Sequence, residues 1–174
     1  MIRSELLAAI SKDNPELRAE EVEQVVGGKE FTLALTRGGE VWSWGKGGKG
    51  NALGLGGSEE QVRPTKVAAL KGHVVTSVAA GQKHAAAVTA EGVLYTFGSG
   101  SSGRLGHGDT QQQASPKRVE VEAWKGRQVT SFACGSGHQP NATATALSKA
   151  TARSTAYVHR EKTGEKRERS REER

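Results

Sequence analysis

The chain has 174 residues, the size of one ordinary domain, and its composition suits short strands and turns better than a thick helical core. Glycine occupies 23 positions, above the roughly 7% that is usual in proteins. No apolar run approaches the roughly 18 residues of a membrane helix, and no segment has the core of a signal peptide. The single cysteine, Cys134, excludes an internal disulfide. We therefore expect a cytoplasmic or nuclear protein without membrane contact.

The net charge of +6 is concentrated at the C-terminal end of the chain. Residues 139–174 contain nine Lys and Arg against five acidic residues, and their only larger apolar side chains are Leu147, Tyr157 and Val158. Such a segment buries too little surface to offset the entropy that ordering costs, so it is predicted to be a disordered basic tail. Its cations are diluted by glutamates, so a solvated tail is favoured over nucleic-acid or chromatin contact.

At the other end, residues 1–21 are predicted to form a helical segment. Asp13 and Glu16 have the spacing of a capping box, and Pro15 occupies an early helical position. The favoured interpretation is a helix that covers the edge of the domain that follows, and the alternative is a partner-binding helix.

An internal repeat follows this segment. Residues 25–45 align without a gap on residues 78–98 at an offset of 53, and after one deletion the match resumes at an offset of 52. The residues that recur are mainly glycines and aromatic residues: Gly28 with Gly81, Gly39 with Gly92, Trp42 with Tyr95, Trp44 with Phe97, and Leu53-Gly54 with Leu105-Gly106. A third copy opens at an offset of 54, and its pattern ends at His138.

Each repeat is predicted to form a set of β-strands. FTLALT (31–36) and EVWSWG (40–45) show a period of two, and Gly39 between them suits a short hairpin loop that needs positive φ. Two further strands are predicted around 65–69 and 74–79. Four strands in about 53 residues correspond to one blade of a β-propeller.

The pattern GxxHxxAVTxxGxLYxFG, followed by a Gly-rich loop, LGHGD and a proline, resembles the repeat of the regulator of chromosome condensation family. The resemblance covers residues 22–138, as two full repeats and the start of a third. It implies an all-β fold, a partial β-propeller of four-stranded blades, whereas known members close a ring of seven blades. Phe31 stands where the family has its histidine.

Other sites that the residues suggest are rejected. GKGGKG (45–50) and GSGSSG (98–103) match a dinucleotide-binding pattern, but loops follow them where that site needs a helix. Cys134 and the histidines do not suggest a zinc site, because repeat-equivalent residues such as His84 and His138 lie in different blades. His84 is instead expected to be packed and hydrogen-bonded between strands. With few aspartates for an acid-base pair, no catalytic residue, metal or cofactor is predicted.

The sequence therefore predicts a noncatalytic protein–protein interaction module, a fragment of a larger scaffold or regulatory protein. One alternative is a guanine-nucleotide exchange factor for a Ran-like small GTPase with chromatin association, and another is the repeat portion of a ubiquitin ligase. Because the loops of a propeller make its contacts, the candidate partner-binding residues are Lys46, Lys49, Arg104, His107 and Asp109. Two blades leave faces uncovered, so self-association or completion by missing repeats is also expected.

Overall fold

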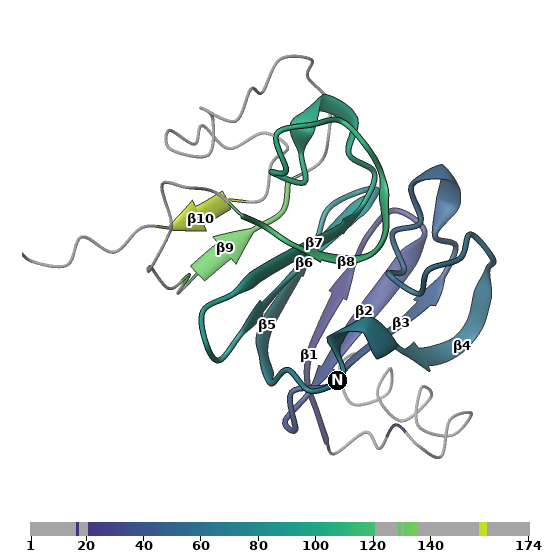
Figure 1. Cartoon of the computed structure of the whole chain (residues 1–174). Coiled ribbons are helices and arrows are strands. Elements are labelled where there is room, and N and C mark those ends of the chain that lie inside the picture. The colour runs from purple at the N-terminus through teal and green to yellow at the C-terminus, as the bar shows by residue number, and fades with distance from the viewer. Residues whose placement is uncertain (1–16, 18–20, 121–128, 130, 136–156, 160–174) are drawn as a thin grey trace, which may run out of the picture.

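The computed structural model describes residues 17, 21–120, 129, 131–135 and 157–159, and these form antiparallel β-sheets (Figure 1). We call the two four-stranded sheets the first and second blades. The first blade contains β1 (Val22–Gly27), β2 (Phe31–Thr36), β3 (Val41–Gly45) and β4 (Gln61–Lys66). The second contains β5 (Val75–Ala80), β6 (His84–Thr89), β7 (Leu94–Gly98) and β8 (Gln113–Arg118). In each blade the strands are paired in chain order. The strand expected around 74–79 is β5, which opens the second blade, and the first blade instead opens with β1.

The two blades repeat each other in detail. Register shifts occur between Val22 and Gln24 and again between Val75 and Ser77, which are the equivalent positions in the two blades. The hairpin turns also recur, because Gly39 has φ of 79° and the equivalent Gly92 has φ of 73°. A side chain would be strained at these angles, which confirms the glycine turn predicted from the sequence.

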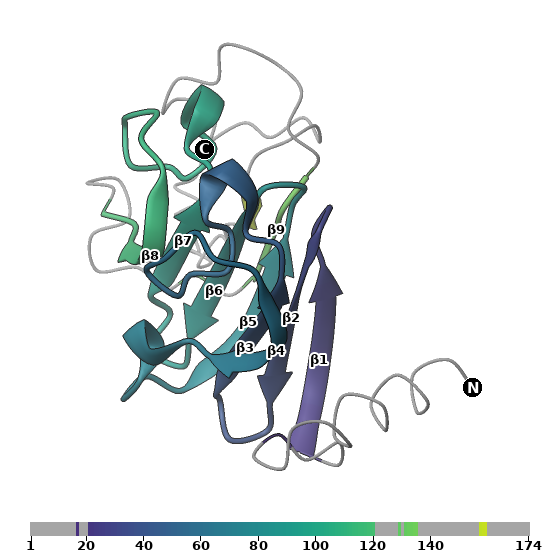
Figure 2. The same cartoon turned by 90° about the vertical axis from the view of Figure 1, so that its right-hand side faces the viewer.

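The core lies between the blades, which lie next to each other with β5 beside β1 and β2 (Figures 1 and 2). Alternate residues of β2 project from the first blade toward the second, where they meet Val78, Ala85, Ala87 and Phe97. The residues that the first blade contributes to this cluster are Phe31, Leu33, Leu35, Val41, Ala52, Leu53, Val67 and Leu70. In addition, the Gln24 side chain donates to Val78 O at 2.8 Å and accepts from Val78 N at 3.0 Å.

The aromatic residues of β3 and β7 lie on equivalent sides of their blades. In β7, Phe97 is fully buried against the first blade. Trp44, the equivalent residue of β3, is partly buried and packs with the buried Trp42 in a cluster that also contains Leu17. Leu17, which precedes the repeats in the chain, packs on the side of the first blade that faces away from the second. The equivalent side of the second blade is the one that packs against the first blade.

The fourth strand of the first blade begins and ends earlier than the sequence predicts. The strand expected around 65–69 lies at Gln61–Lys66, and Ala68–Leu70 forms the 3-10 turn η3, whose Leu70 is buried in the core between the blades. The helix expected over 1–21 lies outside the described residues, apart from Leu17 and Glu21.

The prediction of a disordered tail is wrong for three of its residues. Tyr157–His159 forms β10, which pairs antiparallel with β9 (Ser131–Ala133) of the third repeat. A tyrosine followed by a valine favours the extended conformation in which β10 pairs with the backbone of β9. The rest of the tail lies outside the described residues.

Among the described residues, no helix is long and apolar enough to cross a membrane. These residues also contain no group of three or more His, Cys, Asp or Glu placed to hold a metal ion.

Candidate interaction site on the loops of one rim

Two long loops connect the third and fourth strands of the blades and lie at one end of the molecule (Figures 1 and 2). The first loop comprises residues 46–60 with the 3-10 turn η2 (Gly48–Gly50), and the second comprises residues 99–112 with η4 (Ser101–Gly103). Each loop is anchored by the same hydrogen bond. The hydroxyl of Ser43 donates to Leu53 O at 2.8 Å, and that of Thr96 donates to Leu105 O at 2.7 Å.

The first loop packs closely on the second blade, and its glycines make this approach possible. A Cβ built on Gly54 would lie 2.8 Å from the ring of Phe97, and one on Gly50 would lie 2.8 Å from Ser99 N. Gly56 N donates to Ala114 O at 3.0 Å. This loop is therefore mainly a packing element, and its glycines allow the close contact between the blades.

The five candidate residues occupy different environments. Lys46 is exposed and forms an ion pair with Glu60, with 3.9 Å between Nζ and Oε2. Lys49 lies in η2, and its side chain lies outside what the structure describes. Arg104 is only 8% exposed, which is unexpected for a loop residue chosen as a surface contact, and its Nε donates to Ser101 O at 2.7 Å.

The remaining two candidates lie on the second loop with Arg104. The Nε2 atom of His107 lies 3.1 Å from the hydroxyl of Thr96, and Oδ1 of Asp109 accepts a hydrogen bond from Gln111 N at 3.0 Å. The structure thus brings Arg104, His107 and Asp109 onto one loop. Among the described residues, no hydrogen bond or ion pair joins them to Lys46.

Burial, and for His107 also neighbouring charges, shifts the pKa values of the basic groups on the second loop. Burial lowers the pKa of Arg104. Burial also lowers the pKa of His107, the positive charge of Lys117 lowers it further, and Asp109 opposes the shift. Lys117, on β8, is therefore a neighbour that sequence reasoning missed. The signal that could have found it is the repeat itself, because the equivalent residue of the first blade is the uncharged Thr65.

His84 is packed as predicted, but the predicted hydrogen bonds are not found. Its side chain is fully buried, and neither ring nitrogen has a hydrogen-bond partner among the described residues. Burial, and then the charge of Arg104, lowers the pKa of His84 to about 4, so its ring is neutral at pH 7. Burial raises the pKa of the Cys134 thiol to about 12, so this group is protonated and a poor metal ligand.

Comparison with known proteins assigns the family. A family model described as the regulator of chromosome condensation (RCC1) repeat matches residues 38–88 and 91–139, and a second model with the same description matches residues 22–51 and 75–104. The chain belongs to the RCC1 repeat family. Phe31, at the position of the usual histidine, is thus a variation within an RCC1 repeat.

Curated relatives are much longer proteins. The chain is 50% identical over 110 residues to the human E3 ubiquitin-protein ligase HERC2, a match that covers 63% of this chain and 2% of that protein. It is 41% identical over 117 residues to the ultraviolet-B receptor UVR8 of Arabidopsis thaliana, covering 67% of this chain and 26% of the receptor.

Solved RCC1-type structures have the same fold. Human WBSCR16 superposes with a TM-score of 0.60 at 33% identity, over 66% of this chain and 29% of that one. Prp20p from Saccharomyces cerevisiae gives a TM-score of 0.60 at 23% identity over the same shares, a likeness of fold alone. The RCC1 repeats of this chain thus form antiparallel four-stranded sheets of the propeller type, as the resemblance implied.

Proposed function

We propose that this chain is a noncatalytic protein–protein interaction module, the RCC1-repeat part of a larger scaffold or regulatory protein. The observation that carries the proposal is that the strands and the loops present different kinds of side chains. The large apolar side chains of the strands are used in packing the blades together. The loops of one rim instead present charged and polar groups, including the exposed Lys46 and the half-buried His107 and Asp109.

The relatives support a protein as the partner. Prp20p is described with binding properties to Gsp1p and histones, and another solved structure is of Kap60 bound to yeast RCC1 (Prp20). These partners are those of a protein only 23% identical to this chain, so they support the class of partner and not its identity.

A second candidate is the repeat portion of a ubiquitin ligase, which the 50% identity to HERC2 favours. Here too the repeats would bind a protein, and the ligase chemistry would reside elsewhere in the longer chain. Guanine-nucleotide exchange on a Ran-like GTPase is the weaker alternative, because it is supported by a likeness of fold.

The test combines binding with an exchange assay. The full chain and a rim variant, Lys46→Ala with His107→Ala, are immobilised and exposed to a cell extract, and the bound proteins are quantified by mass spectrometry. The matched control is Arg63→Ala, an exposed cation on β4. We expect a partner that binds the parent and the control saturably and the rim variant at least about fivefold less.

The exchange assay distinguishes the alternatives. Release of a fluorescent GDP analogue from a Ran-type GTPase is measured with a tenth as much chain as GTPase. We expect no acceleration over the spontaneous rate. Acceleration with turnover would show a catalytic activity and would overturn the noncatalytic proposal.

A further inference from the structure

The second loop and the adjoining strand β8 differ from the first blade at four positions that carry charge or a titratable group. The repeat places two small residues, one leucine and one threonine at these positions in the first blade. The pairs are Ala52 with Arg104, Leu55 with His107, Gly57 with Asp109, and Thr65 with Lys117. The first-blade set belongs in part to a packed interface, because Ala52 is fully buried and Leu55 packs against the core between the blades.

Because the blades repeat, the second-blade set lies on the corresponding side of the second blade, the side away from the first. An apolar contact between blades does not need an arginine at this position, as Ala52 shows. The first loop forms its equivalent turn with Ala52 at this position, so the arginine is a feature of the second repeat alone.

Arg104 has few partners for a buried cation. It is 8% exposed, and its one hydrogen bond within the described part of the chain runs from Nε to Ser101 O. The ion pairs that join two described residues, Lys46 with Glu60 and Lys66 with Glu40, both lie in the first blade. The guanidinium of Arg104 forms no ion pair with a described carboxylate, so an anion placed against it would gain charge-assisted hydrogen bonds.

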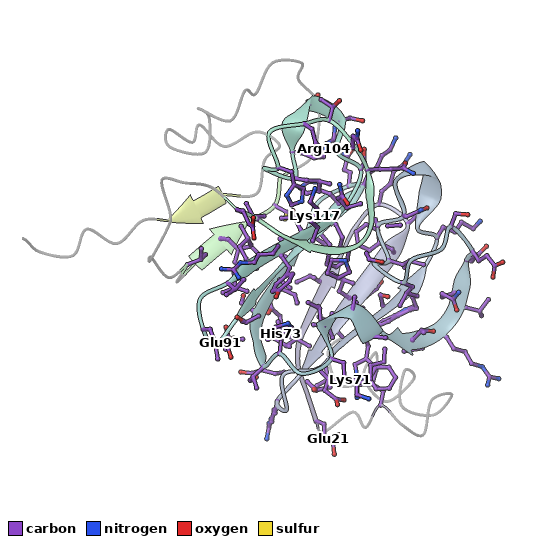
Figure 3. The ribbon with its side chains drawn as sticks, viewed as in Figure 1. Glu21, Lys71, His73, Glu91, Arg104 and Lys117 are labelled. Atoms are coloured by element: carbon purple, nitrogen blue, oxygen red, sulfur yellow. The ribbon has the colours of Figure 1, made fainter. Side chains whose placement is uncertain are left out.

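Within the described part of the chain, no hydrogen bond or ion pair joins Arg104 to a carboxylate. His84, close enough for the guanidinium charge to act on it, is neutral and buried. Lys117 lies opposite Thr96 in the β7–β8 pair, and the hydroxyl of Thr96 is 3.1 Å from Nε2 of His107 on the loop of Arg104. Figure 3 shows Lys117 and Arg104 in the upper part of the view, above His73 and Glu91. Asp109 is the one carboxylate of the loop, and its Oδ1 already accepts from Gln111 N.

We propose that Arg104, with Lys117 as a second cation, binds a glutamate or aspartate side chain of a protein partner. The planar guanidinium matches a carboxylate with two parallel hydrogen bonds, and the low exposure of Arg104 strengthens such a pair. Nucleic acid would need an extended basic surface with several phosphate contacts, whereas this site has two cations and one acid. The inference rests on the proposed function, since it names the chemistry of the partner.

The test measures binding of a fluorescein-labelled hexaglutamate peptide to the full chain by fluorescence anisotropy at about 50 mM salt. Hexaglutamine of the same length and a 12-nucleotide oligothymidine are the comparison probes. The variants are Arg104→Ala, which carries the residue of the first blade, Arg104→Lys, which keeps the charge, and Arg63→Ala as the exposed control. Circular dichroism melting identifies any variant that fails to fold.

We expect saturable binding of hexaglutamate, weaker by at least about tenfold in Arg104→Ala and by a smaller factor in Arg104→Lys, and unchanged in Arg63→Ala. Equal affinity for all folded variants would overturn the proposal, as would oligothymidine binding that exceeds hexaglutamate binding and depends on Arg104. If Arg104→Ala does not fold, Arg104→Lys and Arg104→Gln are compared instead, and Arg104→Gln is expected to lose the binding.

The chain's own tail is the remaining occupant to distinguish. A variant with Glu165, Glu168, Glu172 and Glu173 changed to glutamine is titrated in the same way. Unchanged affinity supports an external carboxylate, and affinity raised at least about tenfold would assign the site to the tail and overturn the proposal. Loss of the captured partner in the Lys46 and His107 variant, without hexaglutamate binding, would leave the proposed function standing while this inference fails.

Discussion

Gly28 and the equivalent Gly81 each pack against the aromatic ring of the residue three positions later. A Cβ built on Gly81 would lie 2.2 Å from Cε1 of His84, and one on Gly28 would lie 2.0 Å from Cε1 of Phe31. The ring three residues later thus rests directly on the glycine in both blades. This explains the Gly-x-x-His spacing in physical terms and shows why Phe31 can replace the histidine, since the position requires a flat ring more than it requires a polar one.

Adding a methyl group at Gly81 should therefore destabilise the fold. Gly81→Ala is expected to lower the free energy of unfolding by about 2–3 kcal/mol, because the methyl group meets both the His84 ring and Gly135 O, 2.8 Å away. The control is Gly27→Ala, where a Cβ meets nothing within 4 Å, and a change within about 0.5 kcal/mol is expected. Urea denaturation measures both. Similar losses in the two variants would contradict the stacking.

The buried His84 should make stability depend on pH. Its pKa is about 4 in the folded protein against 6.5 when unperturbed, so the unfolded chain binds the extra proton between these values. Stability therefore rises with pH through this window, and about 2–3 kcal/mol is lost as pH falls from 7.5 to 4.5. His84→Phe, which copies the first blade, should lack this component.

The urea midpoints of the parent and His84→Phe are compared at the two pH values. All other titratable groups are present in both proteins, so the difference between the two proteins isolates the contribution of His84. At pH 7.5 the variant should be at least as stable as the parent, because it removes two ring nitrogens that lack partners among the described residues. A loss above about 2 kcal/mol at pH 7.5 would show that the histidine makes a stabilising hydrogen bond.

At the scale of elements, the strands with strict alternation were predictable and the outer strand was not. β2 and β3 carry large residues on one face and a glycine turn between them, so their period and hairpin could be identified in the sequence. β4 has the sequence QVRPTK, with a proline and no alternation, and its pairing is determined by the preceding loop, which packs on the second blade. The repeat also located the two loops of the candidate site, but the burial of Arg104 depends on tertiary packing that no local pattern shows.

The two aromatic residues of β7 should differ in what they contribute. Phe97 is fully buried between the blades, whereas Tyr95 is partly buried and its hydroxyl lies 3.1 Å from Nε2 of His73. Phe97→Ala is expected to cost about 3–5 kcal/mol, and Tyr95→Ala less. Urea midpoints of the two variants are compared with the parent, and an equal loss would mean that the blades are not packed through Phe97.

At the scale of the whole molecule, the two sides of the second blade are covered unequally. Toward the first blade it meets a large apolar cluster, whereas its other side presents Ala86, Val88 and Leu94 to a sheet in which the structure describes only two strands. Ala86 stands where the first blade has Leu33, so this side also has less apolar volume. In a repeat fold each blade packs against a neighbour on both sides, so the side of the second blade away from the first is suited to contact a further four-stranded blade.

This unequal coverage predicts that the purified chain does not remain a monomer. A sheet face and edge that lack a full neighbouring blade tend to pair with another chain, and the part of the third sheet that the structure describes, β9 and β10, is smaller than a blade. Sedimentation equilibrium at micromolar concentrations should give a mass above 18.4 kDa that rises with concentration, and RCC1 repeats added in trans should lower it. A constant mass of 18.4 kDa with one cooperative urea transition would show that two blades and a short third sheet form a stable unit, and the expectation of missing repeats would then lose its physical basis.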